Sequence, residues 1–234
     1  MTVISPRLQN GCKHILLLAA LPEEADAFRP GEGRIVEGEA MPARIVDQGG
    51  VHVKIITCGL GKVNAALAVG RYAKADTALV AMTGTCGRIA PIAGDFFWIH
   101  RAIQHDYGAR QSAGFVHYRA GDWPMGDARD QAFAAIADPG LGLPHASIAS
   151  GDVFLECPET AEALAARLGV QLVDMEVAAV AQAAEALGLR WAAIKAVTDD
   201  ADGASSDDFH TNLLRAAQKA AEAMERLVAK LPFG

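Results

Sequence analysis

The stretch LVDMEVAAVAQAAEALG, residues 172–188, decides the fold class of this chain. It opens as a short apolar strand and continues directly as a helix that is apolar on almost every face, which is typical of a buried helix. A second apolar strand follows in WAAIKAVTDDADG, residues 191–203, and it ends in a cluster of carboxylates. This strand–helix–strand unit predicts an α/β protein.

The same alternation runs along most of the chain, with glycine turns between the segments. We expect strands over residues 14–21, 34–38, 43–49, 52–61, 77–87, 95–106 and 145–152. We expect helices from Pro22 and over residues 62–75, 127–138, 158–169 and 205–231, and a long loop over 107–126. Because no repeat, linker or low-complexity segment divides the chain, residues 1–234 are predicted to form one domain with a largely parallel or mixed sheet.

The composition excludes several classes of protein. The chain has 234 residues, of which 51% are hydrophobic, so it can build a sizeable core and is not a disordered chain. A net charge of −7 without a basic stripe argues against nucleic acid as a partner. No apolar run reaches the roughly 18 residues of a membrane span, and the first residues lack the order of a signal peptide. We therefore expect a cytoplasmic protein without membrane contact.

The four cysteines, Cys12, Cys58, Cys86 and Cys157, are widely spaced and form no CxxC pair. This spacing lacks the pattern of a zinc site. Cys58 and Cys86 lie in apolar strands, where a free thiol behaves as a small hydrophobic side chain. We expect structural, buried thiols rather than redox centres.

Two acidic residues occupy positions that a fold would ordinarily avoid. Glu176 opens the apolar helix, and Asp199 ends the strand that follows it. Buried carboxylates are costly unless they are paired, hydrogen-bonded or protonated. Ligands of α/β folds bind beyond the carboxyl ends of the strands, where both residues are expected. The pair therefore predicts acid–base chemistry at that edge of the sheet.

Six motifs occur in the order and spacing of the nucleoside phosphorylase/nucleosidase superfamily. They are LPEE (21–24), GLGKVNAA (59–66), TGTCG (83–87), SGDVF (150–154), DMEVAAVAQ (174–182) and AVTDDAD (196–202). The chain most resembles the methylthioadenosine/S-adenosylhomocysteine nucleosidases, from about His14 to the terminal helix. This resemblance implies a three-layer α/β domain with a central mixed sheet flanked by helices. It also implies hydrolysis of the N-glycosidic bond of a 5′-modified adenosine, with release of adenine.

The resemblance assigns a role to each of three carboxyl groups. Glu24 matches the residue that activates the attacking water, and Asp199 matches the acid that protonates N7 of adenine. Glu176 matches the glutamate that binds the ribose hydroxyls. A neutral acid, a carboxylate base and a carboxylate that favours a cationic sugar are the groups that this bond cleavage needs. No metal or cofactor is expected.

The resemblance also implies a set of substrate contacts and a homodimer. Met175 matches a methionine that packs on the sugar, and Thr85 matches a hydroxyl residue beside the ribose and the water. Phe154 matches an aromatic near the purine, and the Leu155 backbone lies where the family contacts the base edges. Phe209 matches an aromatic near the 5′ substituent.

Two other functions stay open. Arg88, directly after TGTCG, could bind phosphate, which favours a nucleoside phosphorylase. Glu24, in place of an arginine-bearing phosphate loop, favours hydrolysis. The third possibility is a nucleoside-binding protein without turnover. The segment 105–126 keeps only the HD of the family, so the 5′ substituent is not determined.

Overall fold

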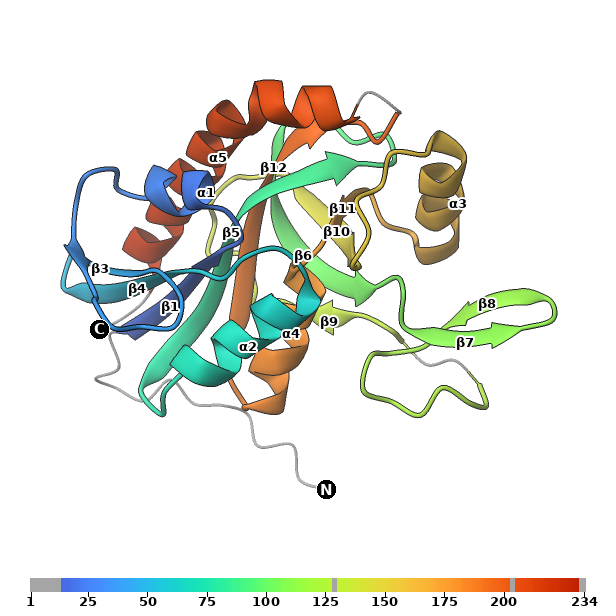
Figure 1. The fold of residues 1–234 in the computed structure, drawn as a ribbon, viewed down its shortest axis with the longest axis horizontal. Helices are drawn as coiled ribbons and strands as arrows, with labels where there is room; N and C mark the ends of the chain where they lie inside the picture. Colours follow the sequence, from blue (N-terminus) through green and yellow to red (C-terminus); the bar gives the residue numbers. More distant parts are fainter. Residues whose placement is uncertain (1–13, 128–129, 203–204, 232–234) are drawn as a thin grey trace.

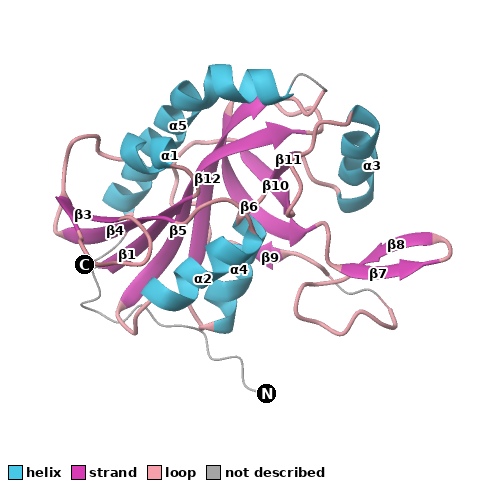
Figure 2. Cartoon of the chain, in the orientation of Figure 1, coloured by secondary structure: helices cyan, strands magenta, loops and turns pink. Residues whose placement is uncertain are grey.

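A central mixed sheet carries helices on both faces (Figures 1 and 2). The computed structural model describes residues 14–127, 130–202 and 205–231. Its helices are α1 (Pro22–Ala27), α2 (Lys62–Tyr72), α3 (Pro158–Leu168), α4 (Val177–Ala186) and α5 (Ser205–Lys230). The fold class predicted from the sequence is confirmed.

Strands far apart in the chain lie side by side in this sheet, in the order β11-β10-β6-β12-β5-β1-β4-β3-β2. Their bounds are β1 His14–Ala19, β2 Arg34–Ile35, β3 Ala43–Gln48, β4 Val51–Thr57, β5 Thr77–Arg88, β6 Phe96–Gln104, β10 His145–Ser150, β11 Leu172–Asp174 and β12 Trp191–Asp199. The strands β1, β4, β5 and β12 pair in parallel, whereas β12 pairs antiparallel with β6. The short strand β9 (Phe133–Ala134) joins β6.

The C-terminal end of β5 pairs with a second strand, β11, and so closes part of the sheet on itself. Arg88 and Gly87 pair antiparallel with Leu172 and Val173 of β11, although β5 also pairs with β12 along most of its length. The strands β5, β12, β6, β10 and β11 therefore form a ring of successive neighbours. As a consequence, the residues that follow β11 come close to those at the ends of β5 and β12.

Each face of the sheet has its own hydrophobic core. On one face, α2 and α4 pack together, and the apolar character of α4 is explained by the complete burial of Val177, Ala178 and Ala181. On the other face, α1 and α5 cover the sheet, with Met224 and Leu227 fully buried. The helix α3 packs against a third cluster that includes Ile103, and it ends at Gly169, whose φ of +63° is the left-handed conformation that glycine favours.

The helix predicted over residues 127–138 is wrong. The described part of that segment contains no helix, and Phe133–Ala134 pairs antiparallel with β6. The amides of Ala135 and Ile136 donate to the carbonyls of His100 and Trp191, and Phe133 is buried. Because these bonds and this burial need a chain laid along the sheet, tertiary contacts override the helix propensity of the alanines.

The loop predicted over residues 107–126 contains a hairpin. Its strands, β7 (Gly108–Gln111) and β8 (Gly114–His117), pair antiparallel and project from the body of the molecule (Figure 1). Gly108 has no room for a side chain, because a Cβ there would lie 2.1 Å from the carbonyl oxygen of Val116. Strands of four residues are too short to give a clear alternation in the sequence.

The expected burial of the cysteines is confirmed for two residues. Cys58 and Cys86 are buried free thiols, and burial raises the pKa of Cys58 to about 12. Cys157 is exposed at the start of α3, because the segment before that helix lies on the surface, so the expectation is wrong there. Cys12 lies outside the described residues. No helix in the described ranges is both long and apolar enough to cross a membrane.

Candidate active site

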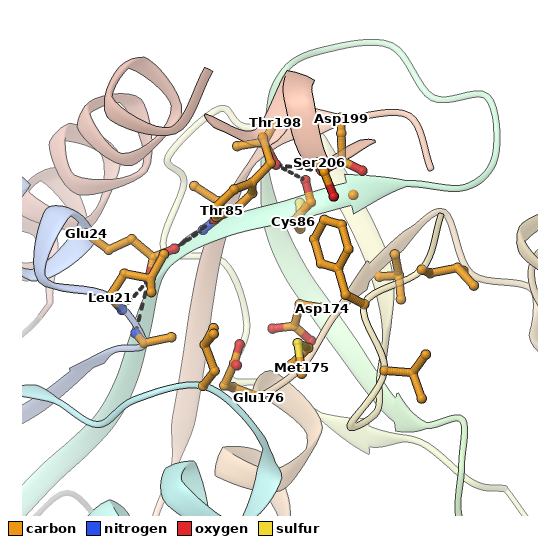
Figure 3. Close-up of a pocket in the computed structure, with 18 of the residues that line it drawn as sticks. Leu21, Glu24, Thr85, Cys86, Asp174, Met175, Glu176, Thr198, Asp199 and Ser206 are labelled. Carbon is orange, nitrogen blue, oxygen red and sulfur yellow. Dashed lines mark hydrogen bonds between the residues drawn. The ribbon is translucent and has the colours of Figure 1, made fainter. Parts of the chain in front are cut away.

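One cavity of about 370 Å³ brings together all eight site residues predicted from the sequence. It lies where β1, β5, β11 and β12 end, together with the segment after β10 and the first turns of α5. The eight residues are Glu24, Thr85, Phe154, Leu155, Met175, Glu176, Asp199 and Phe209. Figure 3 shows Glu24, Asp199 and Glu176 approaching this cavity from three different sides.

Glu24 is a buried carboxylate held by four hydrogen bonds. Its Oε2 accepts from the amides of Ala20 and Leu21 at 3.0 and 3.1 Å. Its Oε1 accepts from the amide and the hydroxyl of Thr85 at 2.7 and 2.8 Å. Pro22, at the start of α1, begins the helix in which Glu24 lies at the third position. These bonds fix the carboxyl group at the junction of β1 and β5.

Asp199 lies at the end of β12 beside an irregularity in the strand pairing. The hydroxyl of Thr198 is 2.8 Å from its Oδ2, and the amide of Ala201 donates to Oδ1 at 3.2 Å. Ala201 has a φ of +51°, which turns the chain back toward the carboxyl group. Burial raises the pKa of Asp199 above its ordinary value, although the bonds from Thr198 and Ala201 lower it. A carboxyl group with a raised pKa can act as a proton donor.

Glu176 lies between β11 and α4, on the opposite side of the cavity from Asp199 (Figure 3). Its Oε1 accepts a hydrogen bond of 2.9 Å from the amide of Gly61, and its Oε2 is 3.8 Å from the ammonium group of Lys195. Burial raises the pKa of Glu176, while the positive charge of Lys195 lowers it. The carboxyl group faces the cavity from a fixed position.

Asp174 lines the cavity and pairs with the buried Lys195, and the sequence reasoning missed both. Lys195 is only 1% exposed in the middle of β12, and its Nζ lies 3.0 Å from Asp174 Oδ2. Asp174 also accepts a hydrogen bond from the hydroxyl of Ser150. Burial lowers the pKa of Lys195, but the two carboxylates outweigh it, so the pKa is raised and the ammonium stays charged. A lysine inside an otherwise apolar strand was the available signal, because buried lysines need charged partners.

The remaining lining is largely apolar. The rings of Phe154 and Phe209 meet edge to face, with their centroids 6.0 Å apart, so segments after β10 and in α5 contact each other at the cavity. Met175 and the segment Val153–Leu155 add to this surface, and His210 and Ser206 lie beside Phe209. An apolar cavity with a few fixed polar groups is typical of a small-molecule site.

Arg88 does not line the cavity. Its guanidinium donates to the carbonyl of Gly94 at 3.1 Å, and its Nε is 3.5 Å from Asp200. Among the described residues that line the cavity there is no lysine or arginine. The observation that favoured phosphate binding in the sequence is therefore not supported by the position of the side chain.

Within residues 14–127, 130–202 and 205–231, no three His, Cys, Asp or Glu side chains are grouped so that they could hold a metal ion.

Comparison with known proteins places this chain in a family. The model of the phosphorylase superfamily matches residues 5–229. The chain belongs to the phosphorylase superfamily. Within the superfamily, it is 32% identical to a futalosine hydrolase of Thermus thermophilus over 182 residues, which cover 74% of this chain and 79% of the relative. It is also 26% identical to a 5′-methylthioadenosine/S-adenosylhomocysteine nucleosidase of Mycobacterium bovis over an alignment of 249 residues. That alignment covers 92% of this chain and 96% of the relative.

The solved structures agree on the phosphorylase superfamily fold. A 5′-methylthioadenosine/S-adenosylhomocysteine nucleosidase of Helicobacter pylori superposes with a TM-score of 0.81 at 21% identity, covering 94% of this chain and all of the other. At this identity, the likeness establishes the fold alone.

Proposed function

We propose that this chain is a nucleosidase that hydrolyses the N-glycosidic bond of a 5′-modified adenosine and releases adenine. The observation that carries the proposal is the convergence of Glu24, Glu176 and Asp199, three buried carboxyl groups in different environments, on one cavity. The relatives named as 5′-methylthioadenosine/S-adenosylhomocysteine nucleosidases support the same reaction.

In the proposed reaction, Glu24 accepts the proton of the attacking water. Its four hydrogen bonds hold the side chain in one position at the cavity, and a general base needs such a fixed position. The hydroxyl of Thr85, which donates to Glu24, lies beside the ribose and the water.

Asp199 delivers a proton to N7 of the departing base. Burial raises its pKa and keeps the acid form available. Glu176 accepts hydrogen bonds from the ribose hydroxyls and stabilises the positive charge that develops on the sugar. Met175 packs on the sugar, Phe154 and the Leu155 backbone contact the base, and Phe209 faces the 5′ substituent. These contacts account for every predicted site residue in the cavity.

The decisive experiment incubates the purified protein with methylthioadenosine and follows the release of free adenine. S-adenosylhomocysteine and futalosine are tested in parallel, because the futalosine hydrolase of Thermus thermophilus makes hydrolysis of futalosine the second candidate function. If only futalosine is cleaved, the protein is a futalosine hydrolase and the proposal of a 5′-modified adenosine as substrate is wrong. Cleavage that depends strictly on added phosphate would establish a phosphorylase instead, and binding without cleavage would establish a nucleoside-binding protein.

We also propose a cytoplasmic homodimer that covers the mouth of the cavity. Leu60, Val153 and Phe154 line the cavity and yet are 52%, 54% and 45% exposed. Val63 and Leu67 extend this apolar surface along α2, where they are 76% and 56% exposed. Contiguous exposed apolar surface supports an interface. Sedimentation of the wild type and of Val63→Asp tests it: the wild type should sediment as a dimer and the variant as a monomer. Cell fractionation tests the location.

A further inference from the structure

Three side chains outside the cavity join three loops into a closed ring of contacts. The Nζ of Lys62 lies 2.6 Å from Oδ1 of Asp106, and Oδ2 of Asp106 accepts from the amide of Asp152 at 3.0 Å. The ring closes where Oδ1 of Asp152 accepts from the amide of Lys62 at 2.8 Å. The loops follow β4, β6 and β10, which are distant in the chain, so the ring is a tertiary feature.

The position of Lys62 indicates that the ring has a functional role. Lys62 is the first residue of α2, where the helix dipole disfavours a positive charge. Its ammonium also donates to the amide oxygen of Gln104 at 3.1 Å, and only 18% of its side chain is exposed. The bonds from Lys62 and from the Asp152 amide outweigh burial and lower the pKa of Asp106. The ion pair therefore persists at neutral pH.

The ring lies next to two parts of the cavity that contact different parts of a nucleoside. The residue before Lys62 is Gly61, whose amide donates to Glu176. Gly61 has a φ of +94°, and a Cβ there would lie 3.0 Å from Oδ1 of Asp152, so its backbone is fitted to the ring. The residues after Asp152 are Val153–Leu155, which line the cavity on the side assigned to the base.

We propose that Lys62, Asp106 and Asp152 are positioning residues that hold the Gly61 amide on Glu176 and the segment 153–155 against the base at the same time. This inference rests on the proposed nucleoside site. Glu24 and Asp199 accept their hydrogen bonds from residues outside the ring, so the ring acts first on the groups that bind the nucleoside.

The variants Lys62→Met and Asp106→Asn test the proposal, with Lys62→Arg as the conservative variant. Loss of a hydrogen bond to a charged group should raise KM about tenfold or more. The fall in kcat should be smaller than the rise in KM, because the variants keep the Glu176 carboxyl group and the hydrogen bonds of Glu24 and Asp199, and they loosen only the Gly61 amide and the segment 153–155. Lys62→Arg should restore most of the KM. The double variant should be no worse than either single variant, because each one already opens the ring.

The matched control is Lys54→Met, which removes an ion pair of the same 2.6 Å length to Glu39, with side chains 22% and 25% exposed. It should change neither KM nor kcat. Hydrogen exchange of the ligand-free protein supplies a second measurement: residues 59–62 and 151–155 should both exchange faster in Lys62→Met and in Asp106→Asn, and not in Lys54→Met.

An unchanged KM in both ring variants, or faster exchange in only one of the two segments, would overturn the proposal. If the wild type neither cleaves nor binds any nucleoside, the proposed function is overturned instead. The exchange measurement distinguishes the two failures, since it needs no substrate.

Discussion

Gly84 leaves the space in which the carboxylate of Glu24 lies. A Cβ at Gly84 would be 2.6 Å from Glu24 Oε1, closer than real Cβ atoms approach, and the φ of +147° at Gly84 disfavours any other residue. The next residue, Thr85, supplies two of the four hydrogen bonds to the same carboxylate. The TGT sequence of β5 therefore makes room for the carboxylate of Glu24, the proposed general base, and also holds that carboxylate in place.

Gly84→Ala should displace the Glu24 carboxylate and lower kcat by about 10²–10⁴-fold, the usual contribution of a general base. The measurement is the steady-state rate of base release. Gly70→Ala is the control: Gly70 is inside α2, and a Cβ there would meet nothing within 4 Å apart from the adjoining backbone of its own helix. It should leave the rate unchanged and stabilise the protein by roughly 0.5–1 kcal/mol. A normal rate in Gly84→Ala would contradict the role of Glu24.

Asp199→Asn should abolish turnover and largely spare binding. Asparagine keeps the shape of the side chain but cannot donate the carboxyl proton, so kcat should fall by about 10²–10⁴-fold. The rate of adenine release and the affinity for methylthioadenosine, measured by calorimetry on the variant, separate the two effects. Turnover near that of the wild type would overturn the assignment of Asp199 as the acid.

Glu176→Gln should weaken both binding and turnover. Glutamine retains the acceptor for the Gly61 amide but loses the negative charge that favours a cationic sugar. Both KM and kcat should therefore change, unlike in Asp199→Asn. A change in kcat with an unaltered KM would show that Glu176 does not bind the ribose.

The same substitution, Asp199→Asn, should change how stability depends on pH. The folded pKa of Asp199 is raised, so its contribution to stability is complete below the unfolded value of about 3.9 and is lost as the pH rises through the folded value. Asparagine has no such loss. Urea unfolding at pH 4 and pH 8 should therefore show the variant gaining stability relative to wild type as the pH rises. If the difference in stability between variant and wild type is the same at both pH values, the pKa of Asp199 is not shifted in the folded protein.

Lys195→Met should destabilise the fold by about 3–5 kcal/mol, because it leaves Asp174 buried beside Glu176 without a cation. Denaturant unfolding at pH 7 measures the loss. Adding Asp174→Asn should recover part of it. Lys219→Met, which breaks the exposed 3.0 Å pair with Asp95, should cost at most about 1 kcal/mol. Equal losses in the two lysine variants would show that burial does not set the strength of the inner pair.

Most of the elements could be predicted because their patterns are local. The strand-then-helix of residues 172–188 and the terminal helix α5 follow the sequence, and the burial of α4 follows from its apolar character. Residues 127–138 show the limit of this reasoning. Their alanines favour a helix, but Phe133 and the amides of Ala135 and Ile136 find partners on strands that the sequence does not reveal as neighbours.

The sequence by itself determined the types and the order of the segments and the unusual carboxylates at the ends of two strands, because propensity, apolar periodicity and the cost of burying charge are local properties. Only the tertiary structure decided that β11 returns to β5. That closure brings Glu176 near Glu24 and Asp199, and it places Lys195 beside Asp174. Pairing between strands depends on which segments of the chain become neighbours. Hydrogen bonds between distant residues form only once those segments lie side by side.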